Sequence, residues 1–99
     1  MNNVLILNLD KEYFNDIING NKVEEYREVK EYWRKRLSKN FNIIEFRMGY
    51  PKKDDKSRIA RFEYLGYEIK NIVHKKFNNK STKVYAIKIG KRLDWWKSV

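Results

Sequence analysis

The stretch Gly20-Asn21-Lys22-Val23-Glu24-Glu25-Tyr26-Arg27 concentrates charged side chains where the chain changes from a helical to an extended pattern. If its second half forms a strand, side chains alternate, so that Glu25 and Arg27 share one face and Tyr26 points to the other. Lys22 falls in the turn before this strand, from which it can lean toward Glu25 and Arg27. Two cations and a carboxylate that converge there can hold a phosphate, orient a base edge or pair with one another.

The flanking sequence predicts the elements that hold this stretch. An apolar run at 4–9 predicts a buried strand, and the spacing of aromatic and aliphatic residues over 11–19 predicts a helix that Gly20 ends. After the stretch we expect a basic helix at 28–39, strands at 41–48, 59–69 and 84–90, and an exposed loop at 49–57. Gly66 is expected to mark a bulge or bend in its strand.

These elements predict one α+β domain over residues 1–99. The chain has 99 residues, which suffices for one hydrophobic core. About five strands and two N-terminal helices favour a small β-barrel, in which the sheet curls around that core.

Charge is distributed unevenly along the chain. The formal net charge is +10, with −3 over residues 1–31 and +13 over residues 32–99. A field of this sign attracts polyanions, so RNA or a nucleotide is the expected partner, with DNA as a further candidate. An acidic protein would be attracted by the same charge, and a solvated surface without a ligand would also have this composition. The cations expected to steer a polyanion are Arg34, Lys35, Arg36, Lys52 and Lys53.

Other classes of protein are disfavoured by composition. The chain has no cysteine, which excludes disulfides and thiolate metal sites and fits a reducing cytoplasm. Asp54 and Asp55 lie among lysines without a second ligand cluster, so no metal is predicted, and the four scattered glycines form no phosphate-binding loop for a cofactor. No apolar run approaches the ~18 residues of a spanning helix, so no membrane partner is expected.

Four residues of the opening stretch form a pattern with fixed spacing. Gly20, Lys22, Glu25 and Arg27 give glycine, any residue, lysine, two residues, glutamate, any residue, arginine, directly after a predicted strand and helix. This pattern resembles the ASCH family, small domains related to the PUA fold. Supporting segments lie at 33–37, 46–50 and 85–90. The likeness covers nearly the whole chain and is to the short versions of the domain from phage and bacterial genomes.

The resemblance implies a PUA-like barrel with a cleft beside the first helix, lined by the motif, and binding of RNA or a nucleotide. Some similar proteins are amidohydrolases that deacylate cytidine modified on its exocyclic amine, using a lysine, a threonine and a glutamate. Lys22 falls on that lysine, but Glu25 occupies the threonine position. Glu45, Glu63 and Glu68 are all candidates for the later glutamate.

Three functional hypotheses follow for the motif. In the binding hypothesis, Lys22 and Arg27 contact phosphate or a base edge, Glu25 orients them, and exposed aromatic rings stack on bases. In the catalytic hypothesis, Lys22 and Glu25 act on an acylated nucleoside. In the structural hypothesis, the three charged residues only pair with one another. The candidate stacking residues are Tyr26, Tyr50, Trp95 and Trp96, whereas His74 is expected to be an ordinary half-buried ring.

Overall fold

The structure, a computed structural model, describes residues 3–52 and 54–93. The elements in chain order are β1 (Val4–Leu9), α1 (Lys11–Ile18), β2 (Glu24–Glu28), α2 (Glu31–Leu37), β3 (Ile43–Met48), the 3-10 turn η1 (Lys56–Arg58), β4 (Ile59–Val73), the 3-10 turn η2 (Lys75–Phe77) and β5 (Ser81–Arg92). They form an α+β fold with one mixed sheet and two helices.

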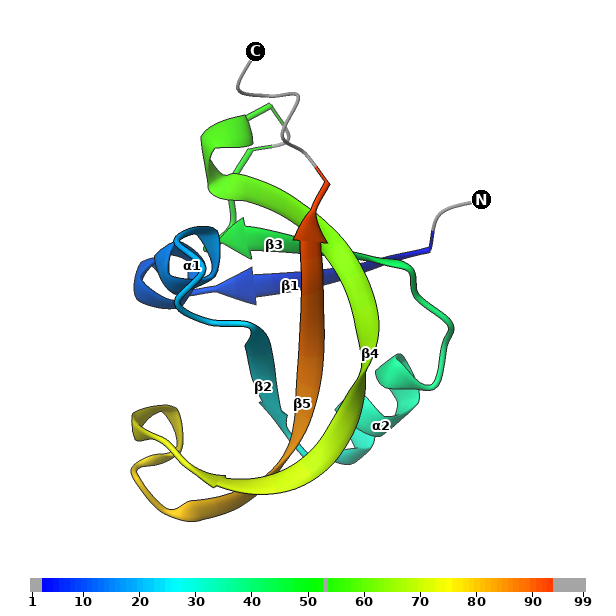
Figure 1. Cartoon of the computed structure of the whole chain (residues 1–99), viewed down its shortest axis with the longest axis vertical. Helices are drawn as coiled ribbons and strands as arrows, with labels where there is room; N and C mark the ends of the chain where they lie inside the picture. Colours follow the sequence, from blue (N-terminus) through cyan, green and yellow to red (C-terminus); the bar gives the residue numbers. More distant parts are fainter. Residues whose placement is uncertain (1–2, 53, 94–99) are drawn as a thin grey trace.

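The sheet has the strand order β1-β3-β4-β5-β2, with β1 and β3 parallel and the other pairs antiparallel. Figure 1 shows β4 as a long curved strand that joins the β1–β3 pair to the β5–β2 pair. The bend follows two register shifts against β5, between Phe62 and Tyr64 and between Tyr64 and Tyr67. Gly66 lies inside the second shift with a φ of +93°, so the predicted irregularity at this glycine is confirmed.

The expected closure into a barrel is not made by strand pairing among the described residues. β1 and β2 are the two edge strands, and each pairs with one neighbour. Side chains bridge the gap instead: Arg27 on β2 donates to the Asn8 carbonyl oxygen on β1 at 3.0 Å, and Arg36 on α2 donates to the Ile6 carbonyl oxygen. Carbonyl groups that a closing strand would bond are therefore satisfied by two guanidinium groups, and the sheet stays open.

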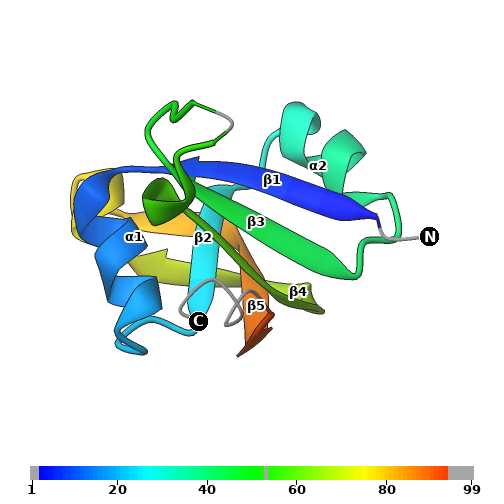
Figure 2. The same ribbon diagram turned by 90° about the horizontal axis from the view of Figure 1, so that it is seen from above.

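The core lies inside this curved sheet. Odd-numbered residues of β1 are buried, as are Ile44 and Phe46 of β3. α1 buries Phe14 and Ile17 against them. Figure 2 shows α1 and α2 at opposite ends of the molecule, and both contribute to the core, α2 through Leu37. The core cluster comprises Leu5, Leu7, Leu9, Phe14, Ile17, Leu37, Ile44, Phe46, Ala60, Phe62, Tyr85 and Ile87.

Candidate functional site

The turn after α1 fixes the position of Lys22. Gly20 has a φ of +76°, a left-handed conformation that reverses the chain at little cost for glycine. The backbone N–H groups of Asn21 and Lys22 then both donate to the Asp16 carbonyl oxygen, at 2.9 and 3.1 Å. The start of β2 is thus tied to α1, and the Lys22 side chain lies between the helix and the sheet.

Register against β5 decides where the next side chains point. Glu25 lies opposite Ile87 and Arg27 opposite Tyr85, and both partners belong to the hydrophobic core. Glu25 and Arg27 therefore face the interior, and the Glu25 side chain is 0% exposed.

Three cations surround the buried Glu25 carboxylate. Lys22 Nζ donates to Oε1 at 2.6 Å, while Arg27 Nη2 and Lys76 Nζ lie 2.7 and 3.3 Å from Oε2. Their side chains are 12%, 18% and 23% exposed, so the charges are largely withdrawn from solvent. We call these four residues the Glu25 cluster. The predicted convergence of Lys22, Glu25 and Arg27 occurs, but beneath the surface.

Lys76 is the member that sequence reasoning missed. It lies in η2, 51 residues beyond Glu25, and its ammonium also donates to the Tyr26 carbonyl oxygen at 2.8 Å. The β4–β5 connection is thereby fastened to β2. Neither the spacing nor the periodicity around Lys76 indicates this contact.

The cluster shifts the pKa of two of its members. Burial alone would raise the pKa of Glu25, but Arg27, Lys76 and Lys22 together outweigh it and hold this pKa below its ordinary value. Burial lowers the pKa of Lys76, helped by the charges of Arg27 and Lys22 and opposed by Glu25. The carboxylate is therefore stabilised in its charged form inside the protein.

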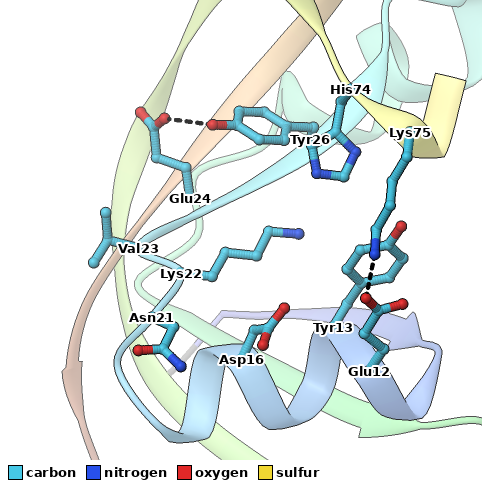
Figure 3. Close-up of a pocket in the computed structure, with 10 residues that line it drawn as sticks. All are labelled: Glu12, Tyr13, Asp16, Asn21, Lys22, Val23, Glu24, Tyr26, His74 and Lys75. Carbon is cyan, nitrogen blue, oxygen red and sulfur yellow. Dashed lines mark hydrogen bonds and ion pairs between the residues drawn. The ribbon is translucent and has the colours of Figure 1, made fainter. Parts of the chain in front are cut away.

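A pocket of about 340 Å³ lies beside α1 and above the Glu25 cluster. We call it the α1 pocket; its lining residues are Glu12, Tyr13, Asp16, Asn21, Lys22, Val23, Glu24, Tyr26, His74 and Lys75. Figure 3 shows Lys22 reaching between Tyr13 and Asp16 on one side and Tyr26 and His74 on the other. Lys22 thus belongs to both the cluster and the pocket, whereas Glu25 and Arg27 do not line the pocket.

Aromatic rings form much of the pocket wall. The His74 ring lies 6.0 Å from Tyr13 and 6.1 Å from Tyr26, measured between ring centroids. Lys22 Nζ lies 4.8 Å from the Tyr13 ring centroid and 5.6 Å from that of Tyr26, within cation–π range. Sequence reasoning gave His74 no part in a site, yet this ring joins α1 to β2 across the pocket.

Polar groups with unused bonding capacity also face the pocket. His74 Nδ1 accepts a hydrogen bond from the Lys76 backbone N–H at 3.0 Å, so in the neutral ring the proton is on Nε2. The Asp16 carboxylate and the Asn21 amide form no hydrogen bond or ion pair with another described side chain. By contrast, Glu24 is bonded to Tyr26 and Lys70, and Glu12 to Lys75.

The other predicted site residues lie away from the pocket. Tyr50 is 93% exposed in the loop after β3, and Lys52 is exposed in the same loop. Arg34 and Lys35 are exposed on α2 and pair with Glu31, while Arg36 bonds to β1. Lys53, Trp95 and Trp96 lie outside the described residues. The three glutamates considered for catalysis, Glu45, Glu63 and Glu68, do not line the α1 pocket.

Over 3–52 and 54–93, no group of three or more His, Asp or Glu side chains could hold a metal ion. In the same part of the chain, no helix is long and apolar enough to cross a membrane.

No family model, no curated protein and no solved structure matches the chain in comparisons with known proteins.

Proposed function

We propose that the protein binds a nucleotide or single-stranded RNA, with a base in the α1 pocket. The observation on which this rests is the convergence of Tyr13, Tyr26 and His74 around the Lys22 ammonium in a pocket of about 340 Å³. That volume is at the lower end of the range of roughly 300–1,000 Å³ typical for small-molecule sites. Unstacked bases bind aromatic side chains, at about 1–3 kcal/mol per base.

Polar groups of the pocket can form hydrogen bonds with the edge of such a base. The Asp16 carboxylate accepts hydrogen bonds from base amino and imino groups, and the Asn21 amide can both donate and accept. His74 Nε2–H adds a donor. Lys22 supplies positive charge for the phosphate or a base carbonyl, while its ion pair with Glu25 holds it in position.

In this proposal the motif residues have different tasks. Lys22 and Tyr26 contact the ligand, whereas Glu25 and Arg27 hold Lys22 and β2 in position from the interior of the protein. The exposed cations Arg34, Lys35 and Lys52 contribute to the field that attracts a polyanion. Membership of the ASCH family, a PUA-like relationship of the curved sheet and a cytoplasmic location belong to the same proposal. The motif at residues 20–27 beside the first helix supports the first two, and the absence of cysteine supports the third.

Binding of nucleoside monophosphates tests the proposal. We expect Tyr13→Leu and Tyr26→Leu each to weaken binding roughly 5- to 150-fold, because each removes a stacking surface of about 1–3 kcal/mol. Titration calorimetry with each of the four ribonucleotides gives the affinities. Tyr32→Leu on α2 is the matched control, since it removes an exposed tyrosine remote from the pocket.

Failure of all four nucleotides to bind the folded protein, or an equal loss in Tyr32→Leu, would contradict a base site in the α1 pocket. The same protein should be incubated with N4-acylated cytidine. Release of cytidine and free acid that is lost in folded Lys22→Ala would reassign the pocket to an amidohydrolase.

A further inference from the structure

A second buried carboxylate lies on the sheet face that points away from the core. Glu45 of β3 is 5% exposed, and it alternates along the strand with the core residues Ile44 and Phe46. Its direct neighbour on β4 is Arg61. Arg47 lies two residues further along β3, on the same face as Glu45.

Each of the two arginines binds a different oxygen of the Glu45 carboxylate. Arg61 Nε donates to Oε1 at 2.8 Å, and Arg47 Nε donates to Oε2 at 2.7 Å, with Arg47 Nη2 2.6 Å from the same oxygen. The two guanidinium groups therefore flank the same carboxylate, one at each of its oxygens. We call Glu45, Arg47 and Arg61 the Glu45 cluster.

Much of the donor capacity of these arginines is unused. A guanidinium group has five N–H donors, and Arg61 uses only Nε on Glu45. Its two terminal nitrogens and Nη1 of Arg47 have no partner among the described residues. The side chains of Arg47 and Arg61 are 35% and 40% exposed, so these donors can reach solvent.

We infer that Arg47 and Arg61 form a contact site for the phosphodiester backbone of single-stranded nucleic acid, an inference that rests on the proposed function. One arginine would suffice to neutralise Glu45, and the second leaves a net positive charge, with planar N–H forks on side chains that are partly exposed. Such forks match the oxygens of a phosphate in pairs. Because Glu45 already fixes both heads, little further ordering is required when phosphate binds.

The neighbouring loop favours nucleic acid over other anions. Tyr50 follows Arg47 by three residues, and its ring is 93% exposed. An exposed ring so close along the chain to Arg47 offers a stacking surface to a base of a strand that binds there. Lys52 and Lys56 are exposed in the segment between Arg47 and Arg61 and add positive charge there, which Asp54 and Asp55 partly offset.

Salt dependence of binding to a backbone-only probe tests this inference. The probe is a labelled abasic phosphodiester 10-mer, measured by fluorescence anisotropy over a range of KCl concentrations. Each phosphate contact contributes about 0.7 to the slope of log affinity against log salt for a single strand. We expect Arg47→Gln and Arg61→Gln each to reduce the slope by about 0.7 to 1.

Lys83→Gln is the matched control, because it removes one exposed positive charge elsewhere on β5. Its slope should stay close to that of the unaltered protein. Arg61→Lys keeps the charge but loses the fork, so its affinity should fall between those of the unaltered protein and Arg61→Gln. Thermal unfolding followed by circular dichroism shows that each variant is folded.

Unchanged slopes in both arginine variants, or an equal change in Lys83→Gln, would overturn the inference. Arginine-dependent binding of an acidic peptide such as poly-glutamate, without binding of the 10-mer, would also overturn it and identify a protein partner. Unphosphorylated nucleosides, titrated in parallel, report the α1 pocket separately. If nucleosides bind but the salt slopes do not depend on the arginines, the inference is wrong and the proposed function stands. If the slopes depend on the arginines but nucleosides do not bind, the base site in the α1 pocket is wrong and the arginine site stands.

Discussion

The Glu25 and Glu45 clusters use the same ingredients, a buried carboxylate and several cations, with different results. Glu25 faces the core, and its three partners are at most 23% exposed. Glu45 faces away from the core, and its two arginines are 35% and 40% exposed. In the first cluster, Arg27 and Lys76 serve to hold β2 and η2 together and only Lys22 lines the α1 pocket, whereas the second cluster presents both of its cations to solvent. Charge at a motif is therefore not equivalent to charge available to a ligand.

The largest effect in this comparison is expected for Glu25→Gln. It leaves three largely buried cations without their carboxylate, and removal of one partner from a buried ion pair costs about 3–5 kcal/mol. Urea denaturation at pH 7 should show this loss in the free energy of unfolding. A loss below about 1 kcal/mol would show that Glu25 is not the centre of the cluster.

Lys76→Met tests the same cluster with a milder change. The variant loses the contacts to Glu25 and to the Tyr26 carbonyl oxygen but retains Lys22 and Arg27. Because methionine suits the buried part of this site and Lys76 is itself penalised by burial, we expect a net loss of about 1–2 kcal/mol. An equal loss in Lys75→Met, whose side chain is exposed, would argue against a specific role of Lys76.

The loss of stability at low pH should distinguish the Glu25 cluster from an ordinary surface ion pair. The pKa of Glu25 is lowered in the folded state, so its stabilising contribution is complete above the ordinary value of 4.5 and is lost as the pH falls through the folded value. The free energy of unfolding should therefore fall steeply below pH 4.5. In Glu25→Gln the fall should be shallower, and identical pH profiles would contradict the lowered pKa.

Glu45→Gln should have the smallest effect on stability. Arg47 and Arg61 can be hydrated when the carboxylate is removed, so we expect a loss of about 1 kcal/mol in the same urea experiment. A loss as large as that of Glu25→Gln would show that the two clusters do not differ in the way their exposure indicates.

Local rules predicted much of the fold. Periodicity and Gly20 predicted α1 to within one residue of its end, and the strand at 41–48 contains the observed β3. The second helix was predicted from residue 28, but Glu28 belongs to β2 and α2 begins at Glu31. Glu28 pairs with Val84 of β5, so a contact with a distant strand overrides the helical tendency of the segment.

The β4–β5 connection was the least predictable region. β4 continues to Val73 and β5 begins at Ser81, beyond the predicted ends of both strands. The turn between them uses left-handed backbone at Asn78 and Asn79, residues that adopt it more readily than most. Lys76 and His74 reach the site through this turn, and no local pattern shows which distant strand a turn will contact.

Alternation correctly predicted which side chains of β2 share a face, but it did not predict what each face contacts. Glu25 and Arg27 share one face and Tyr26 lies on the other, as predicted. Only the register with β5 shows that the first face points into the core and that Tyr26 reaches the α1 pocket. Register depends on pairing with a strand some 60 residues away, which the motif itself does not encode.

The difference between the two clusters is measured most directly at the arginine Nε–H groups by nuclear magnetic resonance. Arg27, Arg47 and Arg61 each donate Nε–H to a buried carboxylate, so their resonances can be followed while the abasic phosphodiester 10-mer is added. The predicted result is a saturable shift of the Arg47 and Arg61 signals with little change at Arg27. A shift at Arg27 with none at Arg47 and Arg61 would contradict the assignment of the Glu45 cluster as the cluster that presents its cations to a ligand.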